Sequence, residues 1–237
     1  MEKIGQIFMI KYLYGKRCYL DDFTKTGKGL WFRDLYTMGM LSNENIKDKE
    51  ECKSIKINSE DISTITLAGR DFPIAPNTHF DISIRPPRCH VLCLSDKGND
   101  PELFALFDAD ICIAINVVKM EEMIREANRH IGIKVVADNI KYYKNNSTEL
   151  LNCKPEEAVF RKPAEPYEKE SEYRIAIFWI NGENSTLNTA EDSHINMFCT
   201  DASENDHITL TFQCPKFNQI VVGVTTFDKS EKKEEKR

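Results

Sequence analysis

The sequence predicts an α+β fold with mostly antiparallel strands, two packed sheets, one main helix and a few short helices. Many short segments alternate apolar and polar residues, which is the period of a strand with one buried face. One segment, residues 119–130, instead carries apolar side chains at helical spacing. No internal repeat or strong boundary in composition is present, so we expect a single domain over residues 1–227. Residues 228–237 are almost all charged and predict a flexible tail.

The first part of the chain is a series of strands separated by turns. Residues 5–13 are apolar on both faces apart from Lys11, as in a strand that is buried on both sides. We expect a short helix at 19–25 and a turn at Gly27 and Gly29. Strands are expected at residues 29–36, 53–58, 62–68, 80–85 and 88–95, a polar surface segment at 42–52, a turn at 69–71 and a loop at 73–77.

The second part contains the main helix. Met120, Met123 and Ile124 recur at helical spacing, and Gly132 ends the helix. Short helical turns are expected at residues 103–107 and 155–160, and strands at 110–118, 133–142 with a candidate break at Asp138, 195–199, 208–212 and 219–226.

The stretch over residues 168–179 is the centre of the predicted site. As a strand, it places Tyr173, Ile175, Ile177 and Trp179 on a core face. Glu172 and Arg174 then share the other face, and Glu170 joins Glu172 there if the extended form starts early. Charged side chains on a mostly apolar strand indicate a functional site. The alternative is that Glu172 and Arg174 form an ion-pair network on a solvated sheet face.

Two cations interrupt apolar strands earlier in the chain. Lys11 either extends its ammonium to solvent or meets an anion. Arg33, between apolar neighbours, either forms a structural salt bridge or binds an anion.

Composition excludes several classes of function. The chain has 237 residues and a net charge of -6, which argues against broad nucleic-acid binding. No apolar run approaches the roughly 18 residues of a membrane helix, and the N-terminal apolar run is too short for a signal peptide. We therefore expect a cytoplasmic protein without a membrane span.

The cysteines and the missing motifs also limit the chemistry. The eight cysteines are scattered, which indicates reduced thiols. Cys89, His90 and Cys93 have CHxxC spacing, but no second ligand pair accompanies them, so no metal site is expected. No phosphate-binding glycine loop, zinc-protease motif or nucleophile elbow is present.

The order of these landmarks resembles that of a large, mostly uncharacterised family of bacterial and phage proteins. The matching landmarks are Lys11 on the opening strand, Cys93-Leu94-Ser95 at a strand end, the apolar turn 103–107, Lys162-Pro163, and Glu170-Ser171-Glu172-Tyr173-Arg174. Together they span roughly residues 5–180. Phe107 departs from the pattern, because the family has a tyrosine at the end of its apolar turn.

The same order is similar to that of ADP-ribosyltransferases, which have an early basic residue, a middle serine and a late Glu-x-Glu. This resemblance implies a split pair of sheets with nicotinamide dinucleotide (NAD) as substrate. It implies that Lys11 or Arg33 pairs with the cofactor's pyrophosphate, that Arg174 is a further cofactor-binding residue, and that Ser95 orients the nicotinamide ribose side or the glutamate. Glu172 would stabilise the charge that develops as nicotinamide leaves, and Glu170 would position or deprotonate the acceptor.

The resemblance also implies a toxin or antiviral-defence setting, in which a nucleotide is the small-molecule partner and an antitoxin or another protein is a further partner. Two alternatives stay open. One is a non-catalytic bacterial or phage interaction or regulatory module. The other is a metal-dependent nuclease that uses Asp108, Asp110 and Glu172, although turn formation explains the two aspartates better.

Overall fold

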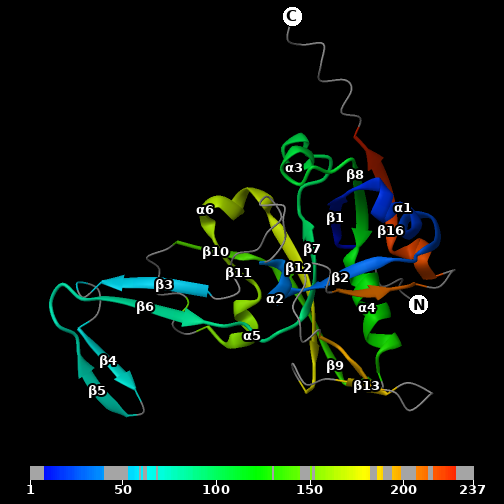
Figure 1. Cartoon of the computed structure of the whole chain (residues 1–237). Coiled ribbons are helices and arrows are strands. Elements are labelled where there is room, and N and C mark those ends of the chain that lie inside the picture. Colours follow the sequence, from blue (N-terminus) through cyan, green and yellow to red (C-terminus); the bar gives the residue numbers. More distant parts are fainter. Residues whose placement is uncertain are drawn as a thin grey trace, which may run out of the picture. The chain divides into compact units, whose positions relative to one another are not determined.

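The computed structural model describes residues 8–39, 53–58, 60, 63–67, 69–129, 131–144, 150, 153–181, 186–188, 194–198, 207–212 and 216–227. Within these ranges the strands form one eight-stranded sheet and four two-stranded sheets, and every pairing except β10 with β11 is antiparallel. The prediction of an α+β fold with mostly antiparallel strands is confirmed (Figure 1).

The chain divides into two compact units. Unit 1 combines residues 1–49, 88–140 and 170–237, and unit 2 combines residues 50–87 and 141–169. Unit 2 is thus built from two insertions into the chain of unit 1. The charged segment 228–237 lies outside the described residues.

Unit 1 contains the large sheet, its helices and one small sheet. The large sheet consists of β1 (Ile10–Gly15), β2 (Leu30–Asp34), β7 (His90–Ser95), β8 (Ile111–Asn116), β9 (Ile133–Asn139), β12 (Glu172–Trp179), β15 (His207–Leu210) and β16 (Val221–Thr226). The other elements are α1 (Arg17–Thr26), α2 (Leu35–Met38), α3 (Pro101–Leu106), α4 (Val117–Ala127), η4 (Lys216–Gln219) and the pair β13 (Thr186–Asn188) and β14 (His194–Asn196).

The large sheet branches at β7. One edge of β7 pairs with β12 along its whole length, and β12 in turn pairs with β9. The other edge is shared, because β2 pairs with the start of β7 at His90 and Val91, whereas β1 pairs with its end at Ser95. β8 and β16 continue from β1, and β15 continues from β2. Ser95 therefore lies where three strands, β1, β7 and β12, meet.

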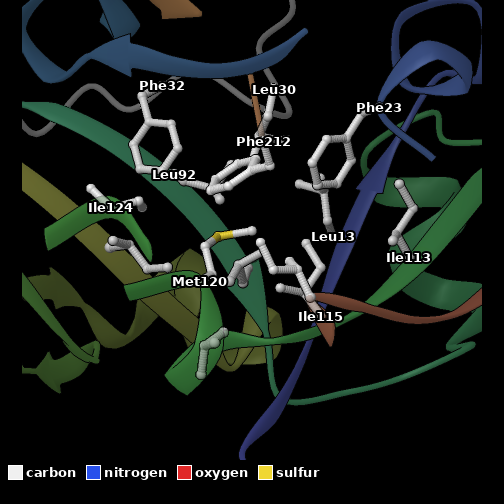
Figure 2. Close-up of a cluster of buried hydrophobic side chains, with 14 of the residues drawn as sticks. Leu13, Phe23, Leu30, Phe32, Leu92, Ile113, Ile115, Met120, Ile124 and Phe212 are labelled. Carbon is white, nitrogen blue, oxygen red and sulfur yellow. The ribbon is translucent and has the colours of Figure 1, made fainter. Parts of the chain in front are cut away.

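The main core gathers apolar side chains from most strands of the large sheet and from two α-helices (Figure 2). It joins side chains of β1, β2, β7, β8, α1 and α4, among them Leu13, Phe32, Leu92, Ile113 and Met120. The predicted core face of β12 is confirmed, because Tyr173, Ile175 and Ile177 belong to this cluster and Trp179 packs against it. Burial of this apolar surface stabilises the branched sheet.

The helix bounds follow from local capping. α4 begins two residues before the predicted start because the Asn116 side chain accepts a hydrogen bond from the Lys119 backbone N–H. α1 ends at Gly27, whose φ of 75° is left-handed. A Cβ at Gly27 would lie 2.5 Å from the Phe212 carbonyl oxygen, so the backbone approach there requires glycine.

Unit 2 is a set of small pairings. Its strands are β3 (Lys53–Asn58), β4 (Thr64–Leu67), β5 (Arg70–Pro73), β6 (His79–Ile84), β10 (Lys141–Tyr143) and β11 (Arg161–Pro163), with helices α5 (Pro155–Ala158) and α6 (Ala164–Tyr167). β5 corrects the expectation of a turn and loop over residues 69–77. Gly69, at φ 75°, reverses the chain so that β5 pairs with β4.

None of the helices in the described ranges combines the length and the apolarity that a membrane span requires. The expected polar segment at residues 42–52 lies outside the described residues.

Candidate functional site

Three of the predicted site residues meet where β7 ends and β12 begins, and the backbone of a fourth, Glu170, lies beside them. Ser95 is the last residue of β7 and Glu172 the first of β12, and the two are cross-strand partners. Arg174 is paired with Cys93 in the same register, so the side chains of Glu172, Ser95 and Arg174 lie on one face of the sheet. All three are buried, with exposed fractions of 4%, 2% and 0%. We call this group the β7–β12 junction.

The charges at the junction are paired rather than solvated. The Arg174 guanidinium donates from Nε and Nη2 to the same oxygen of Glu172, Oε1, and both distances are 2.8 Å. Both partners are buried, so the idea of an ion pair on a solvated sheet face is wrong for this pair. Two donors on one oxygen fix the orientation of the carboxylate.

Glu170 reaches the junction by a turn, not along the strand. It ends a 3-10 helix, η2 (Glu168–Glu170), and Ser171 follows with a φ of 45°. The expectation that Glu170 extends the strand face of Glu172 is therefore wrong. A left-handed φ is uncommon for a residue with a side chain and costs on the order of 1 kcal/mol.

Hydrogen bonds from the end of β7 hold this turn in place. The Ser95 hydroxyl donates to the Glu170 carbonyl oxygen at 2.7 Å and accepts from the Lys97 N–H at 3.0 Å. The Asp96 N–H donates to the Ser171 carbonyl oxygen at 2.9 Å. The serine therefore fixes the backbone between the two glutamates.

Lys11 lies on the opposite face of the sheet. Its neighbour Tyr12 is the cross-strand partner of Ser95, so the alternation of side chains directs Lys11 away from the Ser95 face. The Lys11 ammonium is bonded to Asp96 and, at 3.1 Å, to Asn139, and it lies 4.5 Å from the centre of the Tyr173 ring. We call these residues the Lys11 cluster.

The Lys11 cluster is bordered by carboxylates. The Tyr173 hydroxyl donates to Glu121 at 3.1 Å. Burial and then the Glu121 carboxylate raise the pKa of Tyr173 above its ordinary value, with smaller contributions from Asp138 and Asp96. Asp96 itself is 45% exposed, so the cluster reaches solvent.

Arg33 shares the face of the junction but is set apart from it. It is paired with Val91, which lies on the same face of β7 as Ser95. The Arg33 side chain is half-buried, and its Cζ lies 5.5 Å from the Trp31 ring. The structure thus gathers Ser95, Glu170, Glu172 and Arg174, places Arg33 further along their face and separates Lys11 from them.

Sequence reasoning assigned no site role to Asp96, Asn139, Tyr173 or Ser171. The Ser95-Asp96 pair at a predicted strand end was a usable signal, because a carboxylate next to a candidate site residue is a potential partner for a buried cation. Nothing local identified Asn139 or Ser171, since their roles depend on pairing between β9, β12 and β7.

The residues described by the structure bring together no group of three or more His, Cys, Asp or Glu side chains that could hold a metal. Within the predicted CHxxC spacing, Cys89 is fully buried, and burial raises the pKa of its thiol. Asp110 accepts a hydrogen bond from the Arg17 N–H, and Asp108 pairs with Lys16, so both aspartates support the turns around α1.

No family model, curated protein or solved structure matches the chain.

Proposed function

We propose that the protein cleaves the nicotinamide–ribose bond of NAD at the β7–β12 junction and transfers ADP-ribose to an acceptor or to water. The observation that carries this proposal is the meeting of the Ser95, Glu172 and Arg174 side chains with the backbone of Glu170 around one cross-strand pair, Ser95 and Glu172. A cytoplasmic toxin or antiviral-defence effector, with an antitoxin as protein partner, is the setting that we propose.

Each residue has a role that fits the chemistry. As the C–N bond to nicotinamide breaks, the bonding electrons leave with nicotinamide and positive charge develops on the ribose, which the Glu172 carboxylate stabilises. Arg174 orients that carboxylate. The acceptor oxygen then bonds to the ribose carbon and its proton passes to Glu170. Ser95 holds the turn between the two glutamates.

Arg33 is the better of the two candidates for the cation that binds the pyrophosphate. It lies on the junction's face of the sheet, and a guanidinium suits phosphate oxygens. Lys11 lies on the other face, where Asp96 and Asn139 accept from its ammonium. We assign Lys11 to holding β1 against β7, β9 and β12.

Burial of the junction favours a second candidate, a non-catalytic interaction or regulatory module. Glu172 and Arg174 are almost inaccessible, so the substrate would reach Glu172 only after the site opens. If the pair is purely structural, the protein binds a partner without cleaving a nucleotide.

The test is nicotinamide release from NAD, followed by chromatography. We expect release by the natural chain and its loss in Glu172→Gln and in Glu170→Gln. Glu168→Gln is the matched control, because Glu168 is exposed and lies two residues from Glu170. Circular dichroism and thermal unfolding establish that each variant is folded.

Two outcomes decide between the candidates. Absence of nicotinamide release and of any thermal shift with NAD in the natural chain contradicts the reaction. A stable complex captured from the native host, equally strong with Glu172→Gln, supports the interaction module instead.

A further inference from the structure

A row of aromatic rings lies on the β2–β15 end of the large sheet. The rings of Trp31 and His207 are stacked, with centres 4.1 Å apart and planes inclined by 26°. Tyr19 of α1 continues the row, 5.8 Å from Trp31. The Arg33 guanidinium lies 5.5 Å from the Trp31 ring. We call these four residues the aromatic row.

Strand register builds this surface. His207 is paired with Arg33, and Thr209 with Trp31, so these side chains share one face of β2 and β15. Leu30 and Phe32, which alternate with them, belong to the main core. The aromatic row therefore lies on the outer face of β2 and β15, whose inner face packs in the main core.

The Tyr19 ring ends the row and faces solvent. It is 62% exposed, and among the described residues its only ring contact is with Trp31. Stacking between neighbouring strands stabilises a sheet and accounts for Trp31 and His207. It does not account for Tyr19, which belongs to a helix and leaves most of its ring uncovered.

We propose that the aromatic row binds a purine nucleotide, with the base stacked on Tyr19 and the phosphate bound by Arg33. Bases stack on aromatic side chains with about 1–3 kcal/mol per base, and a guanidinium beside the ring supplies a partner for phosphate. The nucleotide is either free or part of a single strand. The net charge of -6 argues against tight, sequence-independent binding of long nucleic acids.

The site can be tested by tryptophan fluorescence. The chain has two tryptophans, and in Trp179→Phe only Trp31 reports. We expect saturable quenching on titration with AMP, and a weaker response to the smaller base of CMP. Tyr19→Ala should weaken AMP binding by roughly 5- to 150-fold, the range that corresponds to one stacked base. Arg33→Gln should weaken AMP but not adenosine binding.

Lys25→Gln is the matched control. It removes one positive charge from α1, where Lys25 is paired with Asp21 at an exposed position. It should leave AMP binding unchanged. Because Trp179 donates to His90 and its replacement can disturb folding, calorimetric titration of AMP into the natural chain and into Tyr19→Ala provides a second measurement.

The outcomes distinguish a free nucleotide from a single strand, and they distinguish this inference from the proposed reaction. Tight binding of AMP indicates a free nucleotide, whereas tighter, salt-dependent binding of a short oligoadenylate indicates a strand. Absence of AMP and oligoadenylate binding at millimolar concentration, or equal binding by Tyr19→Ala, overturns the inference. This inference shares Arg33 with the proposed function, but nucleotide binding does not require catalysis. AMP binding without nicotinamide release therefore sustains this inference while the proposed reaction fails.

Discussion

The two faces of β12 near its first residues hold two different buried cations. On one face, Arg174 is fully buried and donates twice to Glu172. On the other face, Lys11 is nearly buried but is bonded to Asp96, which is 45% exposed. The two ion pairs lie on opposite sides of the same sheet.

Solvent access to the partner carboxylate distinguishes the two pairs. Water can hydrate Asp96 when Lys11 is removed, whereas it reaches Glu172 only through a rearrangement. A buried charge without its partner is strongly destabilising. Loss of one charge is therefore more destabilising at the β7–β12 junction than in the Lys11 cluster. A ligand that replaces Glu172 or Arg174 in their ion pair must supply comparable hydrogen bonds.

The largest expected effect follows replacement of the junction cation. Arg174→Met removes two charged donors from the buried Glu172 carboxylate and should lower the free energy of unfolding by about 3–5 kcal/mol. Urea denaturation measures this change. The double variant Glu172→Met, Arg174→Met should regain most of the loss because neither charge is left buried; a double variant as unstable as Arg174→Met would contradict this account.

Replacement of Lys11 should cost less. Lys11→Met removes hydrogen bonds to a charged group and a contact with the Tyr173 ring, so we expect a loss of about 1.5–3 kcal/mol in the same measurement. Lys16→Met, in the more exposed pair with Asp108, is the control and should change stability by at most about 1 kcal/mol. Equal losses of stability in Lys11→Met and Lys16→Met would show that burial of the ion pair does not determine its contribution.

Ser95→Ala tests the support of the turn between the glutamates. It removes the donor to the Glu170 carbonyl oxygen and the acceptor for the Lys97 N–H, so a loss of about 1–2 kcal/mol is expected. Under the proposed reaction it should also slow nicotinamide release, and Ser95→Thr should restore part of both properties. An unchanged rate with lowered stability would limit Ser95 to a structural role.

The smallest effect concerns Tyr173. Tyr173→Phe keeps the ring beside Lys11 but loses the hydrogen bond to Glu121, with an expected cost of about 1 kcal/mol near neutral pH. Because folding raises the pKa of Tyr173, the folded chain keeps the hydroxyl proton where the unfolded chain has lost it. This stabilisation is complete below the ordinary tyrosine pKa of about 10 and declines as pH rises above it.

Denaturation at a series of pH values above 9 checks this sign. The decline should be shallower in Tyr173→Phe than in the natural chain. Burial also raises the pKa of Tyr14, so Tyr14→Phe measures how much this second tyrosine contributes to the decline of stability with pH. If the stability of the natural chain rises with pH in this range, the raised pKa values of Tyr173 and Tyr14 are both contradicted.

The sequence by itself determined the class of fold and the local faces. The period of two along residues 173–179 identified the core face of β12, and the spacing of Met120, Met123 and Ile124 identified α4. These patterns are readable because the period of a strand or helix is a local property. The period of two also placed Glu172 and Arg174 on one face, whereas only a resemblance in the order of landmarks placed Ser95 with them; the register of β7 and β12 brings the three together.

The tertiary structure alone decided how those elements meet. Whether Lys11 and Ser95 share a face depends on the pairing of Tyr12 with Ser95, which joins strands about 80 residues apart along the chain. The turn at Ser171 and the division into two units likewise depend on contacts between distant segments. Strand register is set by the packing of the whole sheet, and no local pattern encodes it.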